Sequence, residues 1–344
     1  MEIRNLSEIP VTDLFFCVCD HFEPYWNQAA TEVARRRIKR WVCEYPKYAE
    51  RHKDCDGNLP KHSLFYPEEE YRKEDMVEMA KFCHAGYGEV EIHLHHDNDT
   101  SKNLRKTLVE YKKRLRGDHA LLSVCEETGD IVYGFIHGNW ALDNSRPDGR
   151  WCGVNDEIDI LRETGCYADF TMPSAPSDTQ TRKVNSIYYA VDDPKRPKSH
   201  NQGIDAAVGV RGEGLLMVQG PLGLDWHRRK FGLFPRIENG GLMGNHGPSL
   251  DRTSLWVKER VHIAGYPAWA FVKIYTHGAQ EMIMKMLFDE GGFDSLFSSL
   301  EAIAIEHNLR LHYVSAREMV NVIIAAERGA TSSSPTLRES PYRR

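Results

Sequence analysis

Short apolar runs alternate with longer segments of helical periodicity along most of the chain. Leu104, Leu108, Tyr111 and Leu115 are spaced four, three and four residues apart, which predicts the buried face of an amphipathic helix. The short apolar runs predict strands instead. These strands are expected at residues 14–19, 63–66, 88–95, 131–137, 167–171, 271–275 and 312–314.

Helical patterns or long loops follow each of these strands. Helices are expected at about 31–44, ending ahead of Pro46, at 68–84, at 154–164 and up to about residue 306. The last helix opens with Ser315 and Glu318, the spacing in which side chain and backbone cap each other. Because parallel strands need such crossovers, the pattern predicts a parallel sheet. A chain of 344 residues fits a single α/β barrel domain, expected at 1–327.

Two segments break the alternation. Residues 176–269 are rich in Gly and Pro, with strand-like runs at 186–191 and 215–218. We interpret them as a partly β insertion, with antiparallel strands, that covers one end of the barrel. Residues 328–344 are rich in Ser, Pro and Arg and predict a disordered tail, because they offer little apolar surface to bury.

Composition and charge narrow the class of protein. Forty-four basic and fifty acidic residues give a net charge of −6, without the basic excess typical of nucleic-acid binding. No apolar run approaches the ~20 residues of a membrane span, and residues 1–5 lack the pattern of a secretory signal. The eight cysteines include no Cys-x-x-Cys pair and are too sparse for a disulfide scaffold, which favours a cytoplasmic location.

Histidines concentrate at the carboxyl ends of the predicted strands, where α/β barrels carry their working groups. Six of the sixteen lie at four such ends: His21, His93, His95, His96, His137 and His277. His93 and His95 are two apart and share one face of a strand. With a carboxylate or imidazole from across the barrel, they would chelate zinc or a similar divalent ion. The alternative is a solvated, polar strand end.

Asp20 follows an uninterrupted apolar strand, where burying a carboxylate without a partner is costly. It is expected to be a metal ligand or a general base, with a loop-capping role as the alternative. His137 and His277 each end a strand and precede a glycine, which lets a substrate approach closely, so both are candidate catalytic residues.

Further polar and aromatic residues near the strand ends are candidate substrate contacts. Trp140 is of the type that stacks on sugar rings, although a place in the core is the alternative. The substrate-binding candidates are His21, Glu23, Asn139, Trp140, Asp169 and Glu238. The sequence contains no phosphate-binding loop, dinucleotide fingerprint or Gly-x-Ser-x-Gly elbow.

The order of these motifs resembles the polysaccharide deacetylase superfamily, which includes carbohydrate esterase family four. The matching segments are 17–21, 91–96, 135–140, 167–171 and 272–278, and the resemblance covers roughly residues 12–325 apart from the insertion. The family has a second Asp where this chain has His21, and the second histidine of the family's pair would fall on Asp99. The resemblance implies a distorted barrel of seven β/α units.

The resemblance also implies an activity, which is metal-dependent removal of an acyl group from an N-acylated sugar. A divalent ion, expected to be zinc, would be held by Asp20, by His93 or His95, and by one of His96, Asp97 or Asp99. Asp20 is alternatively the general base. His277 would protonate the leaving amine, and donors near His137 and Asn139 would stabilise the oxyanion. The implied substrate is a free, nucleotide-linked or lipid-linked sugar in a cytoplasmic step of surface-polysaccharide synthesis.

Two other functions fit the same residues. A glycoside hydrolase on a related barrel needs two carboxylates that flank the scissile bond, and Asp20 with Asp169 is the pair to consider. A carbohydrate-binding protein would keep the barrel without catalysis. Loss of the family's second Asp favours this third reading, whereas the histidines at the strand ends oppose it.

Overall fold

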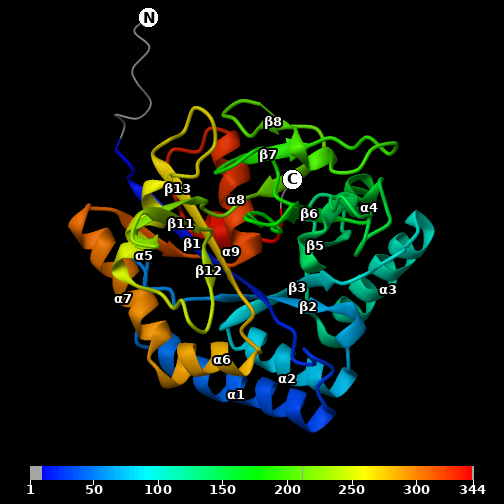
Figure 1. Cartoon of the computed structure of the whole chain (residues 1–344), viewed down its shortest axis with the longest axis horizontal. Coiled ribbons are helices and arrows are strands. Elements are labelled where there is room, and N and C mark those ends of the chain that lie inside the picture. The colour runs from blue at the N-terminus through cyan, green and yellow to red at the C-terminus, as the bar shows by residue number, and fades with distance from the viewer. Residues whose placement is uncertain (1–9, 211, 343–344) are drawn as a thin grey trace, which may run out of the picture.

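The computed structural model describes residues 10–210 and 212–342, which form a mixed α/β fold with a mostly parallel central sheet (Figure 1). The strand order is β12-β13-β1-β2-β3-β5-β6-β9-β7-β8, with β14 beside β1 and β4 beside β5. Within the described residues no hydrogen-bonded ladder joins β12 to β8, so the sheet is open along this path. The strands are β1 (Asp13–His21), β2 (His62–Pro67), β3 (Gly88–Leu94), β4 (Ser123–Val124), β5 (Ile131–His137), β6 (Cys166–Asp169), β7 (Ile187–Ala190), β8 (Ile204–Asp205), β9 (Leu215–Val218), β12 (Gly241–Leu242), β13 (Trp269–Thr276) and β14 (Arg310–Tyr313).

All seven strands expected from the sequence are present, and most of the expected helices follow them. The capping box of Ser315 and Glu318 is confirmed. The helices are α1 (Thr31–Ala49), α2 (Lys73–His84), α3 (Ser101–His119), α4 (Glu157–Glu163), α5 (Leu250–Lys258), α6 (Glu281–Met284), α7 (Gly292–Glu306), α8 (Ala316–Glu327) and α9 (Pro335–Glu339). Among the described residues no helix is both long and apolar enough to cross a membrane.

The prediction that the first helix ends before Pro46 is wrong, because α1 continues to Ala49. A proline inside a helix removes one backbone hydrogen bond and crowds the preceding turn. Here Tyr45 and Ala49 are both fully buried on either side of Pro46. Packing of this last turn therefore outweighs the local preference of the proline.

The two faces of the sheet pack against different helices. Along β1, Leu14, Phe16 and Val18 pack in one core with side chains of α1, α2, α3 and α7, which we call the helix layer. Phe15 and Cys17 pack on the opposite face, the inner face, with side chains of α8 and β9. Figure 1 shows α8 against the sheet and the helix layer around the outside. Since side chains alternate along a strand, neighbouring residues at each strand end face different layers.

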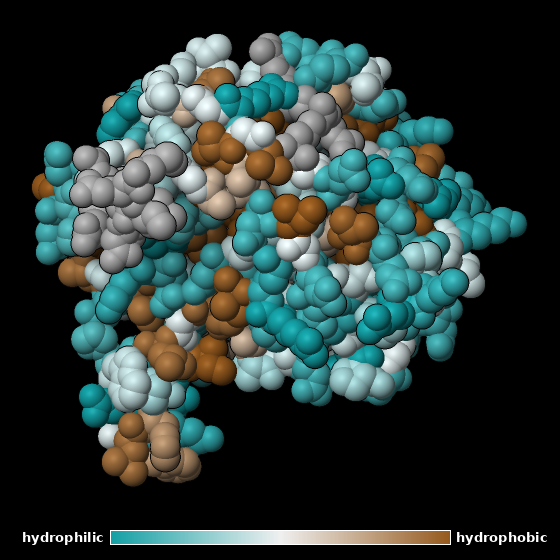
Figure 2. Space-filling model, turned by 90° about the horizontal axis from the view of Figure 1, so that it is seen from above, coloured by the Kyte–Doolittle hydropathy of each residue, from teal (hydrophilic) through white to brown (hydrophobic). Residues whose placement is uncertain are grey.

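The insertion is partly β, as expected, but its placement is corrected. Strand β9 pairs in parallel with β6 and antiparallel with β7, so the insertion lengthens the sheet and does not simply cover one end. Strands β10 (Gly223–Lys230) and β11 (Phe234–Glu238) form a separate hairpin. Its tip exposes Phe231, Leu233 and Phe234. On the face drawn in Figure 2, apolar side chains lie in small groups among polar ones.

The prediction of a disordered tail is wrong for residues 328–342, which lie against the body of the molecule. Arg338 is buried and forms ion pairs with Asp54 (2.9 Å) and Asp56 (2.6 Å). These pairs neutralise a buried charge and compensate for the small apolar surface of the segment. Residues 343–344 lie outside the described part of the chain, as do residues 1–9, where the expected absence of a secretory signal falls.

Candidate functional site

Alternation along the strands sorts the strand-end histidines into two groups. In the register of β3 and β5, His93 lies beside Ile136, and Leu94 lies beside His137. Ile136 packs on the inner face and Leu94 in the helix layer. His93 and His137 therefore point to opposite sides of the sheet, and the single site expected from the sequence divides into two.

The inner-face group gathers around Glu23. Its Oε1 lies 3.2 Å from Nε2 of His93 and 3.2 Å from Nε2 of His95. The possible ligand atoms of Glu23, His93 and His95 all lie within 4.8 Å of one another, as do those of His21, Glu23 and His277. We call these five residues the mouth cluster.

Both histidines that contact Glu23 have their other ring nitrogen beside an oxygen. His93 Nδ1 lies 2.7 Å from the carbonyl oxygen of Ile136, and His95 Nδ1 lies 2.5 Å from Oε1 of Glu69. A hydrogen bond donated from Nδ1 leaves a lone pair on Nε2, which is the usual arrangement of metal-binding histidines. Without an ion the Nε2 groups face Glu23 as hydrogen-bond donors, and with an ion between them the same atoms would present lone pairs to it. Glu23, His93 and His95 could thus hold a divalent ion.

The pKa values in the mouth cluster are shifted because the Glu23 carboxylate is buried beside histidines. Burial opposes ionisation of Glu23, but hydrogen bonds with His93 and His95 hold its pKa well below the usual value. Burial also disfavours the charged form of His95, but Glu23 and Glu69 outweigh it and raise its pKa to about 10. Without a metal ion, a proton on His95 balances the carboxylates.

The other two histidines of the cluster each have a nitrogen that makes no hydrogen bond. His21 Nε2 and His277 Nδ1 are buried and unpartnered, and the two ring centroids are 4.6 Å apart. Burial lowers the pKa of both imidazoles, so both are neutral near pH 7. A buried polar atom without a partner is costly, so a ligand at this position would satisfy both nitrogens.

The mouth cluster opens into a cavity of about 390 Å³. Polar and aromatic side chains dominate its wall. Asn139 and Trp140 reach it from backbone with φ of 54° at both positions, a conformation unusual for residues other than glycine. The other lining residues are His21, Glu23, Tyr25, Trp26, Asn27, Gln28, Glu70, His95, His277 and Gln280.

The expectation that Asp20 is a metal ligand or base is corrected. Asp20 is adjacent to His21 on β1 and therefore faces the helix layer. Its Oδ1 accepts a hydrogen bond from the backbone N–H of Gly278 (2.6 Å), and its Oδ2 lies 2.9 Å from His62 Nε2. A Cβ at Gly278 would lie 2.1 Å from Oδ2, so only glycine permits this approach. Asp20 thus fixes the peptide that follows His277 and does not reach the mouth cluster.

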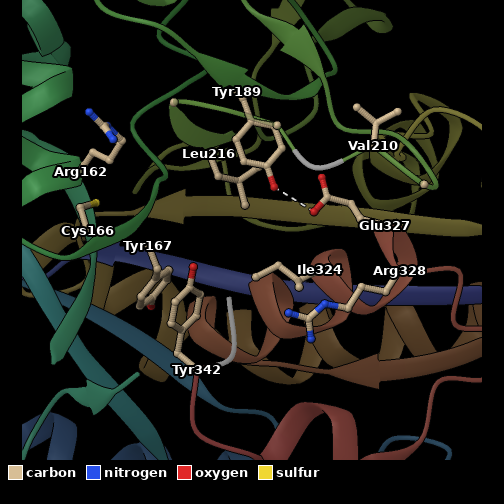
Figure 3. Close-up of a pocket in the computed structure, with 13 residues that line it drawn as sticks. Arg162, Cys166, Tyr167, Tyr189, Val210, Leu216, Ile324, Glu327, Arg328 and Tyr342 are labelled. Carbon is tan, nitrogen blue, oxygen red and sulfur yellow. Dashed lines mark hydrogen bonds between the residues drawn. The ribbon is translucent and has the colours of Figure 1, made fainter. Parts of the chain in front are cut away.

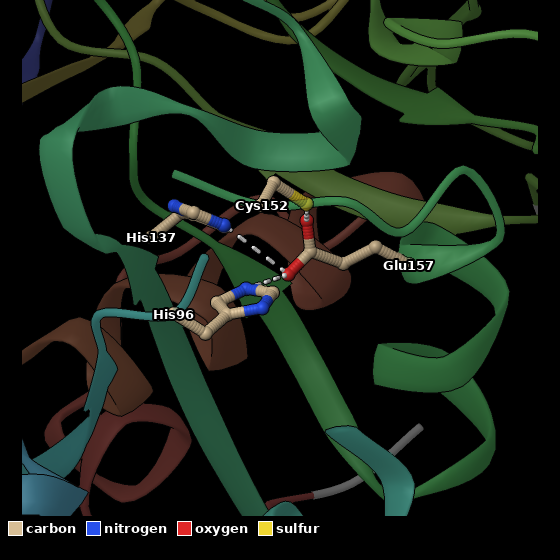
Figure 4. Close-up of side chains that lie close together, drawn as sticks. All are labelled: His96, His137, Cys152 and Glu157. Atoms are coloured by element: carbon tan, nitrogen blue, oxygen red, sulfur yellow. Dashed lines mark hydrogen bonds and ion pairs between the residues drawn. The ribbon is translucent and has the colours of Figure 1, made fainter. Parts of the chain in front are cut away.

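The expected roles of His137, His96 and Asp99 at the same site are also corrected. His137 and His96 lie on the helix-layer side, where both face Glu157 (Figure 4). Asp99 lies 3.1 Å from His96 Nδ1 and outside the mouth cluster. Asp97 accepts backbone hydrogen bonds from Asn98 and Trp151, as a loop-capping residue does.

Two expected substrate contacts lie away from the mouth cavity. Both oxygens of Asp169 accept hydrogen bonds from Thr171, and burial raises the Asp169 pKa to about 7. Glu238 is buried and bound by Arg252 and Trp256. Neither residue lines the cavity. Asp20 does not line it either, so Asp20 and Asp169 are not a pair of carboxylates that could flank a glycosidic bond in this cavity. His21, Glu23, Asn139 and Trp140 do line it.

Several residues of the two sites were not expected from the sequence. Glu69, the partner of His95, follows β2, while Cys152 and Glu157 complete the helix-layer group. Glu69 is one of three consecutive glutamates, and nothing in that run singles it out. Cys152 is a lone cysteine in an irregular loop, so no spacing motif marked it.

A second cavity, of about 300 Å³, lies near the start of β6 and the end of α8 (Figure 3). Its lining combines apolar and aromatic side chains with Arg162, Glu327 and Arg328, and the Tyr189 hydroxyl donates a hydrogen bond to Glu327 Oε2 (2.8 Å). Working groups of parallel α/β proteins gather at the carboxyl ends of strands, and this cavity lies by the amino end of β6. It is therefore not the candidate site.

Glu327 should make the stability of the chain depend on pH. Burial raises its folded-state pKa to about 7, above the value of an exposed glutamate. Its contribution is fully present below the unfolded pKa and is lost as the pH rises through about 7. Between pH 5 and pH 8, wild type should lose about 2 kcal/mol of unfolding free energy relative to Glu327→Gln. Denaturant unfolding of both proteins checks this, and parallel pH profiles would contradict it.

Comparison with known proteins found no protein-family model that matches the chain and no similar curated protein.

Proposed function

We propose that the chain is a metal-dependent hydrolase that removes the acyl group from an N-acylated sugar, in a cytoplasmic step of surface-polysaccharide metabolism. The observation that carries the proposal is the convergence of His93 Nε2, His95 Nε2 and a Glu23 oxygen beside a polar cavity. Three protein ligands with an open side are typical of catalytic zinc sites.

We propose further that the open sheet is a divergent form of the distorted barrel of seven β/α units. The seven expected strands are present in the expected order along the chain, and β13, β1, β2, β3, β5 and β6 pair in parallel. The inner face then corresponds to the barrel interior. The carboxyl ends of β1, β3 and β13 bring the mouth cluster together, which supports this proposal, although its ligand set differs from the one that the resemblance implies.

Glu23, His93 and His95 would hold the ion. A divalent ion bound there would polarise the amide carbonyl and make water a better nucleophile. Glu23 supplies negative charge, and the hydrogen bonds from the two Nδ1 atoms fix the imidazoles for binding through Nε2. In this proposal Glu23 takes the place first expected for Asp20.

His21 and His277 would move the protons. Water adds its oxygen to the acyl carbon, the C–N bond breaks, and the nitrogen leaves as an amine that has gained a proton. Because both imidazoles start neutral, the donated proton must first be gained: His21 accepts a proton from the attacking water, a proton passes to His277, whose ring centroid lies 4.6 Å away, and His277 donates it to the amine. Both residues line the cavity, and each has a buried ring nitrogen that makes no hydrogen bond. Asp20 acts on His277 through Gly278 as a positioning residue.

A sugar fits the chemistry of the cavity wall. Trp26 and Trp140 offer aromatic faces for the apolar side of a pyranose ring, and side-chain amides offer donors and acceptors to its hydroxyls. These amides belong to Asn27, Gln28, Asn139 and Gln280.

Trp140→Ala should therefore raise KM for the N-acyl sugar about tenfold, which corresponds to about 1.4 kcal/mol of binding, and should leave bound metal unchanged. Steady-state acetate release and metal content check this result. Trp151→Ala is the matched control, because Trp151 stacks with Arg146 and does not line the cavity. Equal effects of the two substitutions would contradict a sugar platform at Trp140.

Acetate release from N-acetylated sugars tests the proposed reaction. The zinc-loaded chain should release acetate from a panel of free, oligomeric and nucleotide-linked N-acetyl sugars, lose this activity with a chelator, and regain it with zinc. Cleavage to new reducing ends without acetate would instead indicate a glycoside hydrolase. Binding without any product from the fully loaded protein would indicate a carbohydrate-binding protein.

A further inference from the structure

Four possible metal ligands meet on the helix-layer side of the sheet, opposite the side that carries the mouth cluster. Figure 4 shows how their side chains converge. They come from separate parts of the chain. His96 follows β3, His137 ends β5, Cys152 lies in the loop after β5, and Glu157 begins α4. One ligand atom of each lies within 4.8 Å of all the others.

Glu157 is the centre of this group. Its Oε1 lies 3.2 Å from His96 Nε2 and 3.5 Å from His137 Nε2, and its Oε2 lies 3.4 Å from the Cys152 sulfur. The Glu157 and His137 side chains are fully buried, Cys152 is equally buried, and the His96 side chain is 8% exposed. Neither oxygen of this buried carboxylate forms an ion pair with Lys or Arg among the described residues.

The second ring nitrogen of each histidine lies beside an oxygen. His137 Nδ1 is 2.6 Å from the carbonyl oxygen of Gly138, and His96 Nδ1 is 3.1 Å from Asp99 Oδ2. Both Nε2 atoms then face Glu157, and His137 Nε2 makes no hydrogen bond although it is completely buried. Such outer oxygens orient histidine ligands in metal sites.

The cysteine sulfur lies among both acceptors and donors: without an ion its S–H donates to Glu157 Oε2 and to the carbonyl oxygen of Val154, at 3.4 and 3.5 Å. The backbone N–H groups of Asn144 and Val154 donate to it at 3.3 and 3.5 Å. Donors of this kind stabilise negative charge on sulfur. Asp143 N–H donates to Glu157 Oε2 at 2.6 Å, which leaves Oε1 turned toward the histidines.

We propose that His96, His137, Cys152 and Glu157 bind a structural zinc ion. Two imidazoles, a thiolate and a carboxylate are zinc ligands, and four protein ligands without an open position are typical of structural sites. None of the four residues lines the mouth cavity, which sets this site apart from the proposed catalytic centre.

The proposed ion would stabilise a loop whose backbone is unusual. Between β5 and α4 the backbone has positive φ at five residues other than glycine: Asn139, Trp140, Asp143, Asn144 and Trp151. Such conformations are costly where they are strained, and persist only when their surroundings enforce them. The same loop carries Asn139 and Trp140 to the mouth cavity. The ion therefore links the end of β3 to the loop that forms one wall of the cavity.

Cobalt substitution tests this site directly, because a cysteine thiolate bound to Co²⁺ gives an intense near-ultraviolet charge-transfer band. The mouth cluster contains no cysteine, so an ion bound there does not give this band. The apo chain titrated with Co²⁺ should develop the band in wild type and lose it in Cys152→Ser. Cys55→Ser is the matched control, since Cys55 lies near Asp56 and His312, and this variant should keep the band.

A second variant guards against loss of folding. His96 is the least buried of the four ligands, so His96→Ala should stay folded and bind Co²⁺ with the thiolate band at least about tenfold more weakly. Absence of the band in wild type overturns the proposal, and so does a band that persists in Cys152→Ser or vanishes in Cys55→Ser. The result is independent of acetate release, so the catalytic proposal and this one can fail separately.

Discussion

Glu23→Gln should release acetate at least about a thousandfold more slowly than wild type and should lose the metal ion of the mouth cluster. His93 Nε2 and His95 Nε2 each lie 3.2 Å from Glu23 Oε1. Glutamine keeps the shape of the side chain but removes the negative charge that a divalent ion needs. Initial rates and metal content per chain, measured on the same preparations, check the expectation.

Glu70→Gln is the matched control for this substitution. Glu70 lines the same cavity and accepts a hydrogen bond from the backbone N–H of Tyr25, which a glutamine oxygen can also accept. It lies outside both ligand groups of the mouth cluster, so its variant should keep the metal and lose less than about tenfold in rate. A Glu23→Gln variant that matches Glu70→Gln in both measurements would contradict the assignment of Glu23 as a ligand.

Asp20→Ala should lower the unfolding free energy by about 3–5 kcal/mol while the mouth cluster keeps its metal ion. The Asp20 carboxylate is fully buried and is bound by His62 and by the N–H of Gly278. Removing it leaves both partners buried and unsatisfied, which is costly. Denaturant unfolding and metal analysis measure the two quantities separately.

Asp20→Asn separates the positioning role from a ligand role. The asparagine oxygen can still accept the hydrogen bond from the N–H of Gly278, so this variant should be more stable than Asp20→Ala. Its kcat should also be higher than that of Asp20→Ala, because His277 stays correctly placed. If Asp20→Ala stayed as stable as wild type but lost the metal of the mouth cluster, Asp20 would be a ligand after all.

The sequence could not predict that Glu23, and not Asp20, lies beside His93 and His95. The run from Leu14 to Cys19 is apolar on both faces, as strands buried on both sides are. It therefore carries no alternation that would reveal which of Asp20 and His21 faces the interior. For β3 the spacing of His93 and His95 was enough to place both beside one centre, whereas their common partner Glu23 lies in a loop whose path the pattern does not determine.

Elements were predictable where the local signal and the tertiary environment agree. The bounds of β5, residues 131–137, and the cap at Ser315 follow from periodicity and side-chain chemistry alone. The tail was not predictable, because Arg338 is stabilised by carboxylates at positions 54 and 56, almost three hundred residues earlier. Cys152 and Glu157 join His96 and His137 only through an irregular loop with positive φ at several residues.

Anomalous diffraction from crystals of the zinc-loaded chain tests the central claim most directly, because it locates each ion relative to named side chains. We expect a peak at the zinc edge within about 2.0–2.2 Å of Glu23 and of Nε2 of His93 and His95. A fully loaded crystal without density between these three side chains, or with the ion on Asp20 instead, would contradict the account.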